Sequence, residues 1–309
     1  MKNYFLGALF LTLAACQQEV MPGTDENAET SPIVLKTMID AHSQSRISNN
    51  TETGESAFVE GDKIGLFMAE STNPVAFTYN GVSWQASEPL YWPDNKNNFL
   101  FESFYPYVEE AQRDNIPMPS LLVQDGTLED VSKKDFLTAS HTQNFGENGV
   151  VTLSFGHQYS LMAFTIQITT DGDESATLQS LTLNGDKIVA PATYSFVSTS
   201  ATVQEPSEGT ELALSVNKPC GKEGESLYCL LNPVDLTSGL TVTCKYTVGG
   251  ESYVATTTLS DPNLEKGNMY QYQLKVKERT IEVSGCTVSK WNLQELEDIV
   301  IDAFEDNNE

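Results

Sequence analysis

Short apolar runs separated by turn-forming residues make up most of the chain. Runs of β-branched and aromatic residues, such as Lys63–Met68 and Phe99–Tyr105, are bounded by dipeptides such as Asn80-Gly81. Runs of four to eight such residues between Gly, Pro, Asn and Asp are typical of β-strands. The pattern therefore predicts an all-β protein. No amphipathic helix of about ten residues or more is expected before Leu293.

The clearest local element is a hairpin in the second half of the chain. Residues 241–248 alternate apolar and polar side chains, turn at Gly249-Gly250 and return through residues 253–259. Two alternating runs joined by a Gly-Gly pair predict two antiparallel strands with a two-residue turn.

The number of predicted strands bounds the number of domains. Strands recur about every ten residues, which indicates β-sandwiches, and about fifteen strands are too many for one sandwich. We therefore expect two tandem sandwich domains, residues 32–148 and 149–309, the second ending in a tail at residues 292–309. A long alternating strand that begins near Val151 follows this boundary, and it could instead close the first domain.

The N-terminus has the pattern of a secretory signal. Lys2 precedes an apolar stretch at residues 4–13, so residues 1–15 are expected to form a signal peptide, which is too short to span a bilayer permanently. The tetrapeptide that ends at Cys16 resembles a lipobox, which predicts acylation of the Cys16 thiol. We expect this covalent lipid, and no other cofactor, to anchor the mature chain in a membrane.

Charge narrows the range of partners. The chain carries 43 acidic and 17 basic residues, for a net charge of −26. Such a charge opposes binding to nucleic acid and to anionic lipid headgroups, so no nucleic-acid partner is expected. Residues 16–31 are polar and acidic and have no periodicity, which predicts a short tether after the lipid.

Four cysteines remain besides the lipid site. Cys220, Cys229, Cys244 and Cys286 all lie in the second half and could form disulfides in three pairings. Since Cys229 and Cys244 lie in alternating apolar strands, buried free thiols are the preferred interpretation. The three histidines are scattered and no C-x-x-C occurs, so neither zinc nor another metal is expected; His157 is assigned a structural role.

Sequence signatures of common enzymes are absent. The chain contains no G-x-S-x-G, H-E-x-x-H, P-loop or dinucleotide-binding fingerprint. The acidic turn at residues 171–174 lacks the ligand spacing of a calcium loop. We therefore predict that the protein is not an enzyme, with no catalytic residue assigned.

Five segments of the chain, taken in order, carry a family resemblance. They are residues 58–67, residues 91–93 with residues 104–106, residues 153–157, residues 266–272 and residues 288–291. Together they resemble the fimbrillin family, the lipoprotein subunits of protease-assembled type V pili in Gram-negative gut and oral anaerobes. The resemblance implies two transthyretin-like β-sandwiches after the signal peptide and tether. It also implies a structural or adhesive role in a surface fimbrium.

The resemblance further implies an assembly mechanism. A precursor anchored by Cys16 in the outer membrane, at the cell surface, is cut by an Arg-specific protease, and removal of its first strand opens a groove. The C-terminal strand of another pilin subunit of the family then fills this groove by β-strand addition. Arg46 lies in a polar stretch after the first predicted strand and is the candidate processing site. The host or bacterial surface ligand is not identified by the sequence.

The tail after Trp291 has two interpretations. As a strand it would place alternate side chains on one face and serve as the donor; as a short helix it would cap the last sandwich. The residues of the candidate donor strand are Ile299, Val300, Ile301, Ala303 and Phe304. The sequence leaves both interpretations open.

The alternative function is a glycan-binding or host-ligand-binding outer-membrane lipoprotein that does not polymerise. Exposed aromatic rings would then stack on sugars, and the candidates are Trp84, Tyr91 and Trp92. Burial in a sandwich core is the commoner fate of such side chains.

Overall fold

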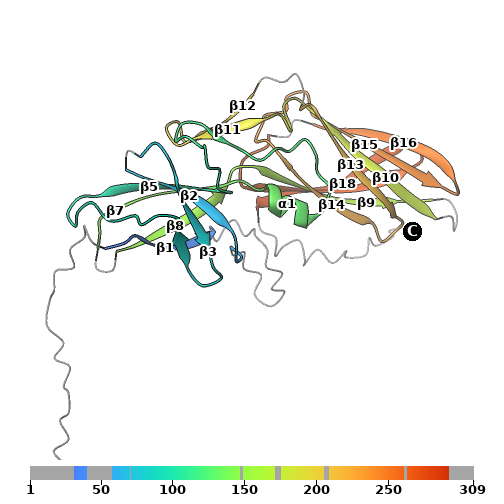
Figure 1. Ribbon diagram of the computed structural model, residues 1–309. Helices are drawn as coiled ribbons and strands as arrows, with labels where there is room; N and C mark the ends of the chain where they lie inside the picture. The colour runs from blue at the N-terminus through green and yellow to red at the C-terminus, as the bar shows by residue number, and fades with distance from the viewer. Residues whose placement is uncertain are drawn as a thin grey trace, which may run out of the picture.

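The computed structural model describes most of the chain after the tether (Figure 1). The described residues are 31–39, 58–69, 71–146, 149–170, 175–204, 209–260 and 263–291. Cys16, Arg46 and the candidate donor strand at residues 299–304 lie outside them. Within them, the secondary structure is eighteen strands and one helix, so the predicted all-β class is confirmed.

The N-terminal unit is built on one seven-stranded sheet of order β1-β8-β7-β5-β2-β3-β4. Its strands are β1 (Val34–Ile39), β2 (Lys63–Met68), β3 (Val75–Tyr79), β4 (Trp84–Ala86), β5 (Phe99–Tyr105), β7 (Leu137–Gln143) and β8 (Val150–His157). The two edge strands, β1 and β4, contact each other. The sheet therefore curls around one set of buried side chains, which includes Trp84, Trp92 and Phe155 and is called the N-terminal core here.

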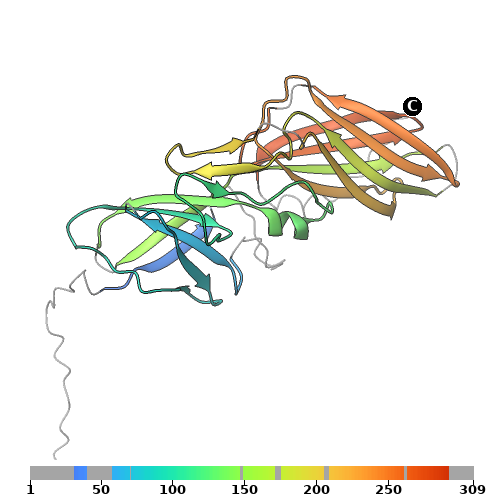
Figure 2. The same cartoon turned by 45° about the horizontal axis from the view of Figure 1, so that its top comes forward.

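The C-terminal unit is a sandwich of two four-stranded sheets, ordered β13-β10-β15-β16 and β14-β9-β17-β18 (Figure 2). Its strands are β9 (Ser160–Ile168), β10 (Ala176–Asn184), β13 (Glu211–Pro219), β14 (Glu225–Leu231), β15 (Leu240–Val248), β16 (Glu251–Leu259), β17 (Asn268–Lys277) and β18 (Thr280–Lys290). Alternate side chains of the two sheets meet in a second cluster, the C-terminal core, which includes Phe164, Leu230, Tyr246 and Trp291. The expected pair of sandwich units is thus present.

A fourth sheet, of three strands, and the helix join the two units. Its order is β12-β11-β6, with β6 (Ile116–Pro117) supplied by the first half of the chain and β11 (Ala192–Ser195) and β12 (Ser200–Val203) by the second. The helix α1 (Leu128–Lys134) begins after Thr127, whose hydroxyl accepts a hydrogen bond from the Asp130 backbone N–H, as N-cap residues do. Val131 of α1 packs into the C-terminal core.

The face of the N-terminal sheet turned away from its own core also contributes to the C-terminal core. Phe67 and Phe104 are stacked with ring centroids 5.7 Å apart, and Phe67 contacts Phe196 at 6.1 Å. Gly65 leaves room for this stack, because a Cβ there would lie 2.4 Å from the Phe104 ring. Gly65, one of the two glycines in residues 58–67, is therefore explained by packing.

The chain leaves the N-terminal core and enters the C-terminal core after β8. Val151 and Phe155 are fully buried in the N-terminal core, whereas Tyr159 belongs to the C-terminal core. The sequence placed the boundary at residue 148, about ten residues earlier, and left open that the alternating strand closes the first unit. The alternating strand, β8, closes the first unit because it pairs with β1. The two strands are far apart in the chain, so no local sequence pattern reveals their contact.

The predicted Gly-Gly hairpin is confirmed. Strands β15 and β16 pair in antiparallel register from Leu240 and Leu259 to Val248 and Glu251. Gly249 and Gly250 have φ values of 56° and 91°. Positive φ at both central residues is the requirement of the turn that best matches the twist of a hairpin.

All four cysteines in the described part of the chain are free thiols, as preferred from the sequence. Cys220, Cys229 and Cys244 are buried and Cys286 is exposed. Burial raises the pKa of Cys220 to about 11 and that of Cys244 to about 12, and it also raises the pKa of Cys229. Because the thiolate is the reactive form, these three thiols are expected to be inert near neutral pH.

This difference predicts one reactive thiol in the folded chain. At pH 8, a thiol reagent added to the mature protein carrying Cys16→Ser should modify Cys286 quickly and the buried three only after unfolding. Counting released chromophore before and after denaturant tests this, with Cys286→Ser as the control that abolishes the fast phase. Two or more fast thiols, or a denatured count below four, would contradict the assignment.

Candidate functional site

The first strand occupies an unusual place in the N-terminal sheet. β1 lies beside β8 (Figure 1), and the two pair in parallel, with Val34 opposite Val150 and Ile39 opposite Phe155. A parallel pair requires a crossover between its strands. Here the crossover includes every other strand of the N-terminal sheet, so β1 is an edge strand that could leave without breaking a hairpin. The other edge strand, β4, is in a hairpin with β3.

The side chains of β1 alternate between core and solvent. Leu35 and Ile39 are 6% and 8% exposed, whereas Val34 and Met38 are 49% and 46% exposed. This period of two is that of a strand with one buried face. β1 is therefore anchored by a few inward side chains and by its ladder with β8.

Contacts across the other edge of β1 close the sheet. The indole Nε1–H of Trp84 on β4 donates to Thr37 Oγ1 at 2.9 Å. Just before β1, the Ile33 N–H donates to the Leu90 carbonyl at 2.8 Å. β1 thus forms the seam where the two ends of the curled sheet meet.

The inward-facing side chains next to β1 are almost entirely apolar. Val151, Leu153 and Phe155 on β8 have no exposed surface, and Phe58 contacts Phe155 and Trp84 with ring centroids 5.3 Å and 5.0 Å apart. Without β1, this face and the polar edge of β8 would be open. An uncovered apolar face beside an unpaired strand edge is a template for another strand.

A single covalent segment joins β1 to the body that follows it. Residues 40–57 connect β1 to Phe58, and Arg46 is the one Lys or Arg among them. A cut in this segment would leave β1 held only by hydrogen bonds and packing. The sequence-predicted processing residue therefore lies on the connection whose cleavage frees the seam strand.

Two of the three aromatic residues predicted as sugar-stacking candidates are buried. Trp92 has no exposed surface and donates through Nε1 to the Gly149 carbonyl at 3.1 Å; Trp84 is 9% exposed. Only Tyr91, at 45% exposed, remains available to a ligand. The two tryptophans fill the N-terminal core because its aromatic cluster needs their volume.

His157 has the structural role assigned from the sequence. Its side chain is fully buried, its Nδ1 lies 2.8 Å from Asp135 Oδ2, and its ring stacks on Trp291 at 3.9 Å between centroids. Trp291 has no exposed surface. Asp135 was not singled out in the sequence, since nothing local marks a carboxylate paired with a histidine across the fold.

Neither a metal site nor a membrane-spanning helix is found in the part of the chain that the structure describes. Within the described ranges, no three His, Cys, Asp or Glu side chains gather so that they could hold a metal ion. None of the helical segments described is both long and apolar enough to cross a membrane.

Comparisons with known proteins agree with the sequence resemblance. A family model described as fimbrillin-like matches residues 46–291. Fim1C of Bacteroides ovatus, named as a candidate fimbrium tip subunit, is 30% identical in an alignment of 192 positions that covers 55% of this chain. The alignment covers 35% of that relative, so the chain spans about a third of its length.

Solved structures share the fold. A candidate cell adhesion protein from Bacteroides ovatus superimposes with a TM-score of 0.60 at 17% identity, covering 84% of this chain and 98% of that one. A fimbrial protein from Bacteroides vulgatus gives a TM-score of 0.54 at 17% identity, with coverage of 84% and 99%. At these identities the similarity concerns the fold.

Proposed function

The chain belongs to the fimbrillin-like family, and on that premise we propose that it is a structural subunit of a surface pilus, or fimbrium. The single observation that carries the proposal is the seam strand β1, which is parallel to β8 and joined to the body only through residues 40–57. A subunit that must open a groove needs one strand that can leave while the rest stays folded.

The proposed cycle begins with a lipoprotein. Acylated Cys16 holds the precursor at the outer membrane on the cell surface, and an Arg-specific protease cuts after Arg46. The lipid, the tether and β1 then leave together. Their departure exposes the apolar side chains of Val151, Leu153 and Phe155 on β8. The anchor is therefore temporary in a subunit that polymerises.

A strand from another subunit of the family completes the cycle. It restores the ladder with β8 and places alternate apolar side chains where Leu35 and Ile39 were. The candidate donor is the segment around Ile299 to Phe304 of the preceding or following subunit, whose apolar residues alternate in the same way. In this role the protein is a structural partner of other pilins rather than a catalyst.

Limited digestion tests the proposal. Treating the mature protein with an Arg-specific protease should cut after Arg46, release β1 on mild heating, and convert monomer into a ladder of oligomers that resists dodecyl sulfate. Oligomers are expected because the exposed apolar side chains and the unpaired edge of β8 would be covered by neighbouring chains. Electrophoresis without boiling and mass determination of the new N-terminus measure the two steps.

Arg46→Lys is the matched control, because it keeps the charge while removing the protease site. It should stay monomeric under the same treatment, and cleavage at Arg113 or Arg279 would be recognised by mass. A protein that is cut at Arg46 and loses β1, yet stays monomeric at all concentrations, would contradict assembly by strand exchange.

A further inference from the structure

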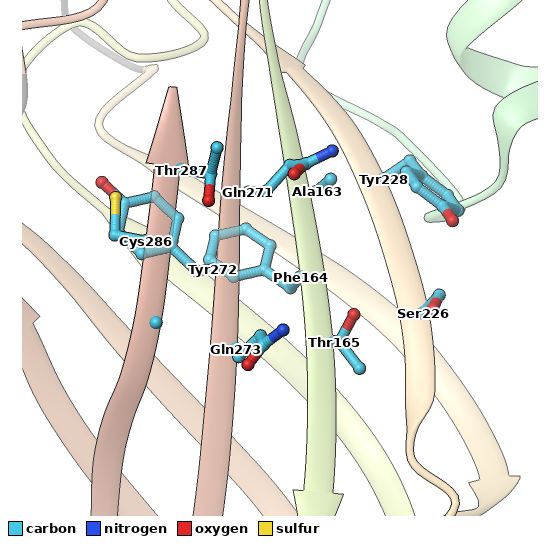
Figure 3. Close-up of a pocket in the computed structure, with 11 residues that line it drawn as sticks. Ala163, Phe164, Thr165, Ser226, Tyr228, Gln271, Tyr272, Gln273, Cys286 and Thr287 are labelled. Atoms are coloured by element: carbon cyan, nitrogen blue, oxygen red, sulfur yellow. The ribbon is translucent and has the colours of Figure 1, made fainter. Parts of the chain in front are cut away.

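A shallow hollow of about 180 Å³ lies on the solvent-facing side of the β14-β9-β17-β18 sheet, away from the seam strand (Figure 3). Its walls come from all four strands. Clefts that hold drug-sized ligands measure roughly 300–1,000 Å³, so this hollow suits a ligand of about one ring.

The hollow follows from the order of side-chain sizes across the sheet. In one cross-strand row, Tyr228 pairs with Ala163, which pairs with Gln271; in the next, Thr165 pairs with Gln273. Small residues on β9 thus lie between a tyrosine on one side and two glutamines on the other. In Figure 3 the Gln271 amide reaches over β9 toward Ala163.

A glycine widens the far side of the hollow. Gly285 on β18 pairs with Gln273, and a Cβ there would lie 3.3 Å from Gln273 Oε1. The missing side chain leaves the glutamine amide uncovered at the rim.

The lining of the hollow is uncharged. It combines hydroxyls, carboxamides, aromatic rings and the exposed Cys286 thiol, and none of the lining residues carries a formal charge. This contrasts with a chain whose net charge is −26. Carboxamides and hydroxyls both donate and accept hydrogen bonds, and the half-buried ring of Tyr228 offers an apolar face.

We propose that this hollow binds one neutral sugar ring of a glycan, with Tyr228 against the ring face and Gln271 and Gln273 on its hydroxyls. A sugar hydroxyl is both donor and acceptor, which matches amides better than it matches ammonium or carboxylate groups. An acidic sugar would be repelled by the negative field of the protein, and nothing in the lining would compensate for its charge.

The proposal goes beyond a role in pilus assembly and does not depend on it. The hollow is on the C-terminal unit and β1 is on the N-terminal one, so a protein that never polymerises would still bind the sugar. Sugar binding at the hollow and pilus assembly through β1 can therefore be disproved independently of each other.

Saturation-transfer NMR on the mature full-length chain carrying Cys16→Ser tests the site. Glucose, galactose, mannose and N-acetylglucosamine are the probes, each titrated singly, with N-acetylneuraminic acid as the charged comparator. At least one neutral sugar should bind, and Gln271→Ala should weaken that binding about tenfold through lost hydrogen bonds. Tyr228→Ala should reduce it at least as much.

Matched controls lie elsewhere on the surface. Gln85→Ala, at an exposed position of β4, and Tyr91→Ala should leave binding unchanged. Absence of binding for all four neutral sugars would overturn the proposal, as would preference for the acidic sugar or equal binding by the Gln271→Ala variant. If Tyr91→Ala alone abolished binding, the sugar site would lie on the N-terminal unit instead, which also overturns it.

Discussion

Replacing Leu35 with aspartate is expected to free β1 from the N-terminal sheet. Leu35 is 6% exposed and faces the fully buried side chains of β8. Truncating a buried leucine costs about 2–5 kcal/mol, and an unpaired carboxylate in an apolar site adds a desolvation penalty. β1 has no hairpin partner to hold it in place, so local release should precede unfolding of the remaining sheet.

Protease accessibility and thermal unfolding measure this effect together. Leu35→Asp should speed cleavage after Arg46 at least tenfold, and the protein should form oligomers without prior removal of β1. Val34→Asp is the matched control, because it places the same charge on the adjacent residue of β1, whose side chain is 49% exposed. Equal cleavage rates for the two variants would show that the inward face of β1 does not hold the strand.

Replacing Trp291 with alanine should give the second large effect, on the C-terminal core. Trp291 has no exposed surface and stacks on His157 at 3.9 Å, and its backbone N–H donates to the Gly267 carbonyl at 3.0 Å. Losing a buried tryptophan side chain costs about 3–5 kcal/mol. The buried His157 side chain would in addition lose the ring that stacks on it.

Calorimetry or circular dichroism should show Tm lowered by about 10 °C for Trp291→Ala, given the size of the chain. Trp291→Phe, which keeps a stacked ring, should recover part of the loss. Val288→Ala is the control on β18, the strand that ends just before Trp291, since Val288 is 54% exposed and should change stability by less than about 0.5 kcal/mol. A Tm for Trp291→Ala within the range of that control would contradict the packing role.

Local elements were the part of the fold that the sequence predicted well. The β15–β16 hairpin was visible because its alternation and its Gly-Gly turn are both short-range signals. The small strands β6, β11 and β12 were not predicted, since each has four residues or fewer. Helix α1 was not predicted either, because its seven residues are too few to show a clear helical period.

The candidate site was predicted only in part. The first strand was found from the sequence, whereas Arg46 stays a prediction. The parallel pairing of β1 with β8 was not predicted, since pairing across more than a hundred residues leaves no local pattern. The same limit explains why the sequence left open whether the strand after residue 148 closes the first unit. It also explains why exposure of Trp84 and Trp92 could not be decided, because an aromatic ring looks alike in sequence whether it fills a core or faces a ligand.

The sequence by itself determined the all-β class, the two-unit organisation and the family, because strand period, turn residues and short motifs are local properties. The tertiary structure decided which strand is the seam, what Trp84, Trp92 and Trp291 cover, and where an uncharged hollow opens on an acidic protein. These features depend on contacts between residues far apart in the chain. Such contacts are fixed by how the sheets close over shared apolar side chains.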